Sequence, residues 1–312
     1  MPRPEPAYRR LLREGGFPDR VRAAQAALKD CDLCAWACHV DRTQKIGFCR
    51  TGAEAIVSSA FPHMGEEDPL TGGHGSGTIF FALCNLRCQF CQNYEISQEG
   101  EGRITSVEEL AEVMLRLQAV GCHNINFVSP SHVIPSIIAA VHLAAEAGLS
   151  IPLVYNTGGY DSLAGLRLLD GIIDIYMPDM KYADPVLAQR YSKILDYPAH
   201  NQAAVREMHR QVGDLQLDDE GIATRGLLVR HLVLPEGIAG TEAIVRFLAE
   251  EISTNTYINV MGQYRPAWRV RERDIAPLNR PVTRQEVEEA TAIARRAGLR
   301  LDERGSRILR WL

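Results

Sequence analysis

From residue 78 onward, short apolar runs alternate with longer amphipathic segments. The short runs predict buried strands and the longer segments predict helices. Strands are expected over residues 78–83, 124–128, 151–155, 172–177, 227–234 and 257–261, and helices over 106–120, 134–147, 162–169, 185–212, 241–252 and 283–296. Six such β/α repeats predict an α/β fold with a parallel sheet, in the form of an open, partial (β/α)6 TIM-like barrel.

Local signals place several helix ends. Ser106 and Glu109 have the spacing of a capping box, so a helix is expected to begin there. The segment 283–286, Thr-Arg-Gln-Glu, repeats the pattern before the last helix. Gly148 is expected to end the helix over 134–147. A further helix is expected over 18–28, with Pro18 near its start.

Polar and glycine-rich residues follow each predicted strand. Because the carboxyl ends of parallel barrel strands meet at one rim, where the chemistry of such folds gathers, these segments are expected to be neighbours. They are residues 84–91, 129–132, 156–159, 178–181, 235–237 and 263–266. The pattern predicts a functional site at that rim.

Three cysteines follow the first predicted strand. Cys84, Cys88 and Cys91 have the spacing Cys-x3-Cys-x2-Cys, with no obvious fourth cysteine nearby. Structural zinc sites and ferredoxin clusters normally take four protein ligands, so three close thiolates indicate a 4Fe–4S cluster with one iron open to another ligand. A three-cysteine zinc site or unpaired buried thiols are the alternatives. Cys122 stands apart and is interpreted as a packing residue.

A second group of cysteines precedes the barrel. Cys31, Cys34, Cys38 and Cys49 could form a closed four-thiolate site, which is typical of a structural metal. Zinc and a second iron–sulfur cluster both suit thiolates, and a metal-free reduced segment is the alternative. Residues 61–77 are glycine-rich but lack the lysine of a P-loop, and they are interpreted as a linker. We therefore divide the chain into a metal-stapled N-terminal extension, residues 1–77, and the barrel, residues 78–312.

Composition limits the classes of function. The 312 residues include 34 Lys and Arg against 39 Asp and Glu, and the formal net charge of −5 argues against a broad nucleic-acid surface. The N-terminal residues lack the apolar core of a signal peptide, and the most apolar segment, 133–149, is too short to span a membrane. We expect a cytoplasmic protein whose cysteines serve as metal ligands rather than in disulfides.

The cysteine spacing, with Phe90 directly before the last cysteine, resembles the signature of the radical SAM superfamily. The flank from Cys88 to Asn93 resembles the pyruvate formate-lyase activating-enzyme branch. The resemblance implies a 4Fe–4S cluster on the three cysteines, S-adenosylmethionine (SAM) on the open iron, and a deoxyadenosyl radical that takes a hydrogen atom from the substrate. The protein then supplies placement, electrostatics and exclusion of water. On this interpretation Phe90 and Asn93 are SAM-binding residues, and a flavodoxin or ferredoxin is the reductant.

The resemblance extends to two rim segments. Residues 156–159, Asn-Thr-Gly-Gly, are similar to the Asp-Thr-Asn-Gly of the activating enzymes, and residues 177–181 are similar to their Met-Leu-Asp-Leu-Lys. In that family these segments bind a monovalent cation, and the lysine meets the SAM carboxylate. The implied cation ligands are Asn156, Thr157, Met177 and Asp179, and the implied SAM contacts are Asp179 and Lys181. An asparagine stands where the family has its first carboxylate, and a rim ion pair is the alternative for Asp179 and Lys181.

Three more rim segments are assigned by resemblance and by position. Residues 237–242 are similar to a glycine-rich region near the adenine, which makes Gly237 and Gly240 SAM candidates. The alternative there is a turn in which Thr241 caps a helix. The Gly-Gly-Glu that binds the SAM amino group in many members is absent, and its replacements would be Ser129, Ser131 or His132. Tyr264 and Arg265 are expected at the substrate opening, where the arginine could bind a carboxylate or phosphate.

A four-cysteine element ahead of the motif departs from the better-known activating enzymes and resembles a less characterised, activating-enzyme-like branch. The first hypothesis is a radical SAM enzyme that acts on a glycyl residue of a partner polypeptide. The second is a radical SAM enzyme that acts on a small molecule or peptide. The third is a redox or zinc-binding scaffold without catalysis. No nucleic-acid or membrane partner is expected.

Overall fold

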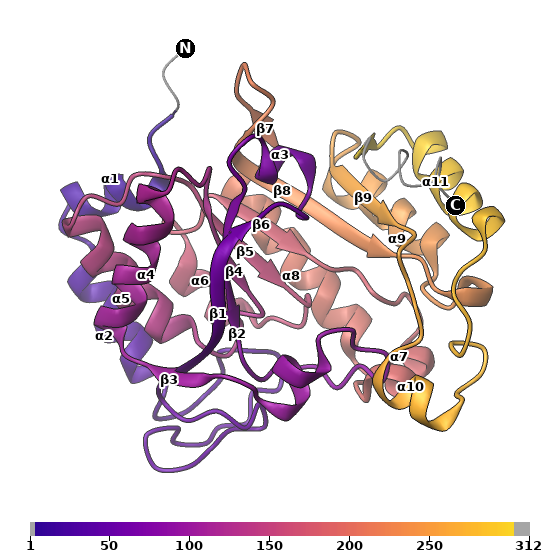
Figure 1. Ribbon diagram of the computed structural model, residues 1–312, viewed down its shortest axis with the longest axis horizontal. Coiled ribbons are helices and arrows are strands. Elements are labelled where there is room, and N and C mark those ends of the chain that lie inside the picture. Colours follow the sequence, from indigo (N-terminus) through magenta and orange to yellow (C-terminus); the bar gives the residue numbers. More distant parts are fainter. Residues whose placement is uncertain (1–3, 303–312) are drawn as a thin grey trace.

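The structure, a computed structural model, describes residues 4–302 and is built around a ten-stranded sheet. Seven of its strands run parallel, in the order of the sequence: the two-residue edge strand β10 (Arg300–Leu301) and six strands of the β/α repeats. The strands of the six repeats are β2 (Ser76–Phe81), β4 (Ile125–Val128), β5 (Leu153–Thr157), β6 (Ile175–Pro178), β8 (Ala223–Leu232) and β9 (Tyr257–Met261). The sheet stays open, with β3 (Arg103–Thr105) at one edge and β10 at the other (Figure 1). The predicted α/β fold with a partial (β/α)6 barrel is confirmed.

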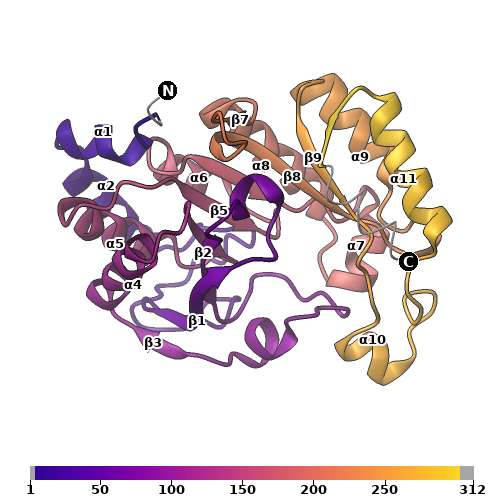
Figure 2. The ribbon, with the colours of Figure 1, turned by 45° about the horizontal axis from the view of Figure 1, so that its top comes forward.

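Helices connect these strands and flank the sheet (Figure 2). Those of the six repeats are α4 (Val107–Ala119), α5 (Ile134–Glu146), α6 (Leu163–Leu169), α8 (Tyr197–Val212), α9 (Thr241–Phe247) and α11 (Arg284–Arg296). The helical region predicted over 185–212 is divided into α7 (Pro185–Ser192) and α8, because Lys193 takes a left-handed conformation that ends α7. Both predicted capping boxes are present, at Ser106 and at Thr283.

Two N-terminal helices cover the outer face of α5. The helices α1 (Ala7–Arg13) and α2 (Phe17–Ala26) both pack against it. The Tyr8 hydroxyl donates to the Ile151 carbonyl at 2.9 Å, and the Phe17 ring stacks on His142 at 4.9 Å. Because α5 is covered on two sides, its sequence is apolar around most of its circumference.

A strand before the barrel extends the sheet. β1 (Ala55–His63) pairs antiparallel with β2 on one side and with β3 on the other. The segment 61–77 is therefore not an irregular linker throughout, as the sequence suggested: it contains the end of β1, the short helix α3 (Asp68–Thr71) and the start of β2. β1, which precedes the predicted boundary at residue 77, pairs with β2, which crosses that boundary. The division of the chain into an extension and a barrel stays a prediction.

The helix α3 closes the barrel at the end where its parallel strands begin. Leu70 is fully buried in an apolar cluster with Val154, Ile175 and Leu228 of the barrel strands. The Asn124 side-chain amide donates to the Leu70 carbonyl at 2.9 Å. In Figure 1, α3 lies at the opposite end of the molecule from α7 and α10. The barrel interior is thus filled by apolar side chains at one end and open toward the other.

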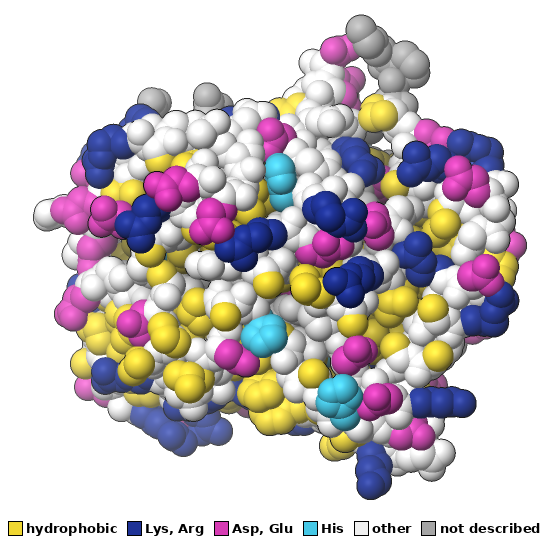
Figure 3. All heavy atoms as spheres, turned by 180° about the vertical axis from the view of Figure 1, so that it is seen from behind, with side chains coloured by type: hydrophobic (Ala, Val, Ile, Leu, Met, Phe, Trp, Pro, Cys, Tyr) yellow, Lys and Arg dark blue, Asp and Glu magenta, His cyan; other side chains and the backbone are white. Residues whose placement is uncertain are grey.

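The other described elements are short. They are η1 (Glu95–Glu99), β7 (Gln216–Leu217), η2 (Pro235–Gly237), η3 (Leu248–Ile252) and α10 (Trp268–Arg273). None of the helices described over residues 4–302 has the length and apolar character needed to cross a membrane. Acidic and basic side chains are interspersed over the face seen in Figure 3, in keeping with the nearly balanced composition.

Candidate active site

The loop that carries Cys84, Cys88 and Cys91 begins just after β2, at the carboxyl-terminal rim of the barrel. Leu83 has a positive φ of 65°, and its N–H donates to the Ile96 carbonyl at 2.9 Å, so the chain turns sharply as it leaves the strand. Cys84 and Cys88 are buried, and Cys91 is half-buried. The three cysteines therefore lie together at the rim where the sequence placed the functional site.

Each of the three sulfurs has a hydrogen-bond partner of its own. The partners are the Leu86 N–H on Cys84 (3.4 Å), the Ser192 hydroxyl on Cys88 (3.0 Å) and the Ser97 hydroxyl beside Cys91 (3.1 Å). Thiolate ligands of iron–sulfur clusters accept such bonds, and the bonds together with burial tune the reduction potential. Three sulfurs, each supported in this way, suit a cluster that the protein holds by three ligands. Sequence reasoning missed Ser97 and Ser192, because nothing in their spacing relates them to the motif.

Aromatic side chains enclose this cysteine loop. The group of buried side chains packed around this loop includes Leu86, Phe90, Tyr160, Tyr182, Tyr191, Tyr197 and Tyr264. Phe90 meets the rings of Tyr182 and Tyr264 edge-on, with centroids 6.5 and 5.8 Å apart. Tyr264 is 2 % exposed and its hydroxyl donates to the Leu278 carbonyl at 2.6 Å, so it packs beneath the loop rather than at an opening. This enclosure excludes water from the buried sulfurs.

A buried ion network lies beside the cysteines. Lys181 Nζ donates to Asp179 at 2.5 Å, and Arg230 Nε donates to the other oxygen of the same carboxylate at 2.8 Å. Although burial alone would raise it, these two cations hold the pKa of Asp179 below its usual value. Burial raises the pKa of Cys88 to about 12, and the charge of Lys181 acts against that rise. Asp179 and Lys181 thus form a buried pair next to the cysteine loop, not an exposed rim pair.

The four side chains predicted to bind a monovalent cation point to different places. Asn156 lines the barrel cavity, whereas Met177 lies in the apolar cluster around Leu70. The Thr157 hydroxyl donates to Asp161 at 2.7 Å, and Asp179 is bound by Lys181 and Arg230 as described above. A cation at this rim would therefore rely on backbone carbonyls or on rearranged side chains.

Asp161 is the centre of a buried hydrogen-bond network that includes Thr157, a predicted cation ligand, and Ser131, a predicted SAM contact. It is fully buried and accepts hydrogen bonds from the hydroxyls of Tyr155, at 2.8 Å, and Thr157. The Ser131 hydroxyl lies 3.0 Å from that of Thr157, so this SAM candidate faces the same network. Burial raises the pKa of Asp161, and the three hydroxyls oppose that rise.

The other two candidates for the SAM amino group have structural contacts. Ser129 has a positive φ of 58°, and its N–H donates to the Asn156 carbonyl at 2.9 Å. His132 is 1 % exposed, and its Nε2 lies 3.1 Å from the Ala82 carbonyl. Burial, with the charge of Arg42, lowers the pKa of His132 to about 4, so its imidazole is neutral at physiological pH. His132 is thus a buried, neutral side chain held against the residue that follows β2, and its assignment to SAM stays a prediction.

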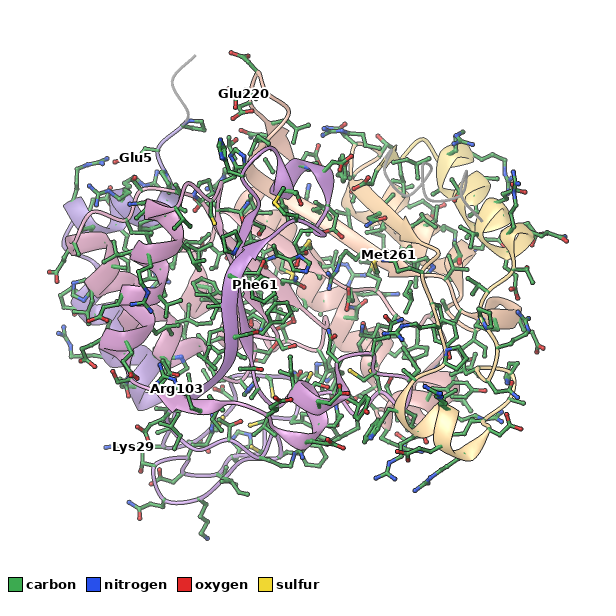
Figure 4. All side chains as sticks on the ribbon, in the orientation of Figure 1. Glu5, Lys29, Phe61, Arg103, Glu220 and Met261 are labelled. Atoms are coloured by element: carbon green, nitrogen blue, oxygen red, sulfur yellow. The ribbon has the colours of Figure 1, made fainter. Side chains whose placement is uncertain are left out.

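A cavity of about 670 Å³ occupies the open part of the barrel. Gln92 and Asn93 line it at the cysteine loop, and Glu66 and Glu67 line it near α3. Between these ends it is bounded by strand residues, which include Phe80, Val128, Asn156, Arg230, Asn259 and Met261. Met261 on β9, labelled in Figure 4, lies on one side of the cavity, and Phe61 on β1 stacks on the lining residue Phe80. Its volume is typical of small-ligand sites, and its position joins the predicted SAM residue Asn93 to the barrel interior.

The remaining rim candidates line other hollows. Gly237 and Gly240 border a groove of about 440 Å³ between α9 and α11. Gly240 has a φ of 72°, and a Cβ there would lie 2.7 Å from that of Ala183, so glycine is required for this close approach. Arg265 lines a separate hollow of about 460 Å³ with Tyr94 and Trp268, whose rings stack.

The four N-terminal cysteines also lie close together. Cys31, Cys34 and Cys49 are buried and Cys38 is half-buried. A Cβ on Gly47 would lie 3.4 Å from the Cys49 sulfur and 3.5 Å from the Cys38 sulfur. Burial raises the pKa of Cys34, and the nearby thiols of Cys49 and Cys31 add to the rise.

In neither cysteine group do the donor atoms stand in the closed geometry of a bound metal. This holds for every set of three or more His, Cys, Asp or Glu side chains over residues 4–302. The support for both groups is therefore the proximity of their thiols, together with the hydrogen bonds to Cys84, Cys88 and Cys91.

The two cysteine groups are neighbours, which the sequence did not reveal. Arg87, inside the cysteine loop, donates from Nη2 to the Phe48 carbonyl at 2.8 Å and from Nη1 to the Cys84 carbonyl at 2.6 Å. Its guanidinium interacts with thiols of both groups, those of Cys84 and Cys49. Trp36 Nε1 donates to the Asn85 carbonyl at 2.6 Å and adds a second link.

Comparison with known proteins identifies the family. Residues 78–248 match the family described as the Radical SAM superfamily. The chain belongs to the radical SAM superfamily. Membership implies a 4Fe–4S cluster and SAM as cofactors, and the three supported sulfurs of Cys84, Cys88 and Cys91 fit that cluster.

Two proteins show how far the similarity of this radical SAM protein extends. An uncharacterised protein of Methanocaldococcus jannaschii is 31% identical over 290 residues, which cover 90% of this chain and 79% of that one. The crystal structure of HydG, a maturase of the FeFe-hydrogenase, matches with 14% identity and a TM-score of 0.48. That match covers 69% of this radical SAM protein and 47% of HydG, so the chain spans about half the length of HydG. The likeness to the activating-enzyme branch stays a prediction.

Proposed function

We propose that this radical SAM protein cleaves SAM reductively and abstracts a hydrogen atom from a substrate bound in the barrel cavity. The observation that carries the proposal is that the loop holding Cys84, Cys88 and Cys91, each sulfur with its own hydrogen-bond partner, continues directly into Gln92 and Asn93, which line one end of that cavity. When bound, the cluster and SAM supply the electron and the radical, and the chain supplies their environment.

Several residues have definable roles in that environment. The hydrogen bonds to the three sulfurs and the surrounding tyrosines would set the reduction potential and keep water away. Lys181 places a positive charge near Cys84 and Cys88, and Asp179 holds it there. Asn93 reaches the cavity from the cysteine loop and is the SAM candidate best placed for contact. Lys181 would bind the SAM carboxylate only by sharing its hydrogen bonds with Asp179.

The shape of the cavity favours a small molecule or a flexible peptide as substrate. Its polar end lies deep in the barrel, near α3, where a folded partner could not reach. A glycyl residue on a protruding loop of a partner is the second candidate, and the similarity of residues 88–93 to the activating enzymes supports it. For either substrate, a flavodoxin or ferredoxin is the proposed reductant. The four N-terminal cysteines are proposed to hold zinc or a second cluster.

The test is anaerobic reconstitution of the full chain with iron and sulfide, followed by dithionite and SAM. Formation of 5′-deoxyadenosine is expected. An intact cluster that yields none would favour a non-catalytic scaffold and contradict the proposal. Addition of partner polypeptides then separates the two substrate classes, because a glycyl radical gives a characteristic EPR doublet. Metal analysis of protein purified without oxygen distinguishes zinc from iron at the N-terminal cysteines.

A further inference from the structure

Two consecutive acidic residues form the deep end of the barrel cavity. Glu66 and Glu67 directly precede α3 and are only 9 % and 6 % exposed, yet both line the cavity. The height of Glu66 in the barrel follows from its interaction with Asn126 on β4. Asn126 lies beside Thr78 of β2, which is three residues before the end of that strand. At about 3.3 Å per residue, the two carboxylates lie roughly 10 Å below the rim. They therefore face the cysteine loop from the other end of the cavity.

Glu66 and Glu67 form the floor of the cavity, and the basic side chains nearest to this floor already bind another carboxylate. Arg230 interacts with both glutamates, but its Nε donates to Asp179 at 2.8 Å. Lys181 binds the same aspartate from the other side. Arg230 therefore serves three carboxylates at once, and a buried carboxylate without compensating charge is costly.

The pair itself is under electrostatic strain. Burial, followed by the charge of Glu67, raises the pKa of Glu66 to about 7. The other titratable groups that face it are His63, whose Nδ1 lies 3.6 Å from Glu66, and Asp302, which lines the same cavity. At neutral pH, a positive charge delivered to this floor would displace the proton of Glu66.

Polar atoms at the floor also lack hydrogen bonds. Glu67 Oε1 accepts from Asn259 Nδ2 at 3.0 Å, but Oε2 receives none from the described residues when both acids are ionised. Asn126 is fully buried, and although its amide interacts with Glu66, neither its nitrogen nor its oxygen meets hydrogen-bond geometry within residues 4–302. It lies on the same face of β4 as Val128, which lines the cavity, so its amide points inward. Buried polar atoms of this kind require a partner.

We propose that Glu66 and Glu67 bind a cationic group of the substrate, an ammonium or guanidinium, with Asn126 as an additional hydrogen-bonding partner. The inference rests on the proposed function and names the substrate class of the same cavity: a small organic cation. Held at the floor by its positive end, such a molecule would extend toward the cysteine loop, which brings its C–H bonds to the end where Asn93 and Gln92 lie.

A metal ion and SAM itself fit the floor less well. No three His, Cys, Asp or Glu side chains of the described residues surround a common point there. In a radical SAM protein, the amino and carboxylate groups of SAM would be held beside the cluster of Cys84, Cys88 and Cys91, at the other end of the cavity. A cavity of about 670 Å³ is also large enough for an organic ligand.

The test uses the reconstituted full-length protein in anaerobic calorimetry, with SAM present. The probes are 1,4-diaminobutane and agmatine, with 1,4-butanediol and succinate as neutral and anionic controls. We expect the two cations to bind, the controls not to bind, and the affinity to rise from pH 6 to pH 8 as Glu66 loses its proton. Glu67→Gln should weaken cation binding by roughly tenfold or more, whereas Glu112→Gln, on the exposed face of α4, should leave it unchanged.

Three outcomes would overturn the inference. They are equal binding of cations and butanediol, unchanged cation affinity in Glu67→Gln, and binding of Mn²⁺ alone that excludes the amines. A loss of SAM affinity in Glu67→Gln without an effect on amines would assign the floor to SAM instead and would also contradict it. If wild-type protein forms 5′-deoxyadenosine but fails the amine tests, the proposed function stands and only the substrate class is refuted. Circular dichroism and thermal unfolding of each variant establish that it is folded.

Discussion

Ser192 donates a hydrogen bond to the Cys88 sulfur at 3.0 Å, although the two residues are 104 positions apart in the chain. Ser192 is fully buried at the end of α7, and the Tyr182 hydroxyl lies 2.9 Å from its oxygen. The helix thus brings an ordered polar group to a buried ligand of the proposed cluster.

Replacing Ser192 by alanine is expected to lower the reduction potential of the cluster and leave its iron content unchanged. In the wild type, the Ser192 hydroxyl stabilises the more negative, reduced form of the cluster, and the substitution removes this stabilisation. A loss of about 1 kcal/mol corresponds to a fall of roughly 40 mV in the one-electron reduction potential. An EPR-monitored redox titration measures the change. Ser150→Ala, at an exposed position, is the control. An unchanged potential in Ser192→Ala would refute a role for this hydrogen bond in tuning.

Cys88→Ala and Cys34→Ala are expected to fail in different ways. Cys88→Ala should lose the radical SAM cluster and lower 5′-deoxyadenosine formation by roughly a hundredfold or more, because the cluster then has two protein ligands. Cys34→Ala should mainly reduce the yield of soluble protein, because the four N-terminal cysteines are proposed to hold a metal that stabilises the fold of the N-terminal segment. Iron content, yield and SAM cleavage are measured for both. A well-folded Cys34→Ala protein that loses SAM cleavage as completely as Cys88→Ala would argue against a structural role.

Asp179→Asn should destabilise the protein substantially. The substitution leaves the largely buried side chains of Arg230 and Lys181 without the carboxylate that binds both, and breaking a buried ion pair in this way costs about 3–5 kcal/mol. Denaturant unfolding measures the loss. The matched control is Glu112→Gln, which removes an exposed pair with Arg116 and should cost less than about 0.5 kcal/mol. Similar losses in the two variants would mean that the Asp179 network contributes little.

The pKa of Glu66 predicts how stability changes with pH. Its folded value of about 7 lies above the ordinary value of 4.5, so between these values the folded state holds a proton that the unfolded state has lost. Stability from this group is therefore present below about pH 4.5 and declines as the pH rises to about 7. Glu66→Gln should remove that decline, which is on the order of 1–3 kcal/mol.

Unfolding curves of wild type and Glu66→Gln at pH 5 and pH 7.5 test this prediction. The comparison uses the difference between the two proteins, because the lowered pKa values of His132 and His231 act in the opposite direction over part of the range. Parallel pH profiles for the two proteins would show that Glu66 is not protonated in the folded state.

Much of the barrel followed from local sequence patterns. The six parallel strands of the repeats, the capping boxes at Ser106 and Thr283, and the position of Cys84 at the rim depend on residues close together in the chain. β1 and α3 escaped prediction for the opposite reason. β1 contains Pro62 and two serines and is held by pairing with β2 and β3, and α3 is only four residues long.

By itself, the sequence determined the repeat of apolar strands and amphipathic helices and the cysteine spacing that marks the superfamily, because both are periodic or local. Only the tertiary structure decided which distant groups meet. It brought Ser192 to Cys88, Arg87 between two sets of cysteines, and Glu66 and Glu67 to the floor of the barrel. These contacts depend on Leu70, which fills the barrel next to α3, and on the strands, which fix the position of each side chain along the barrel axis. No short-range pattern in the sequence encodes that arrangement.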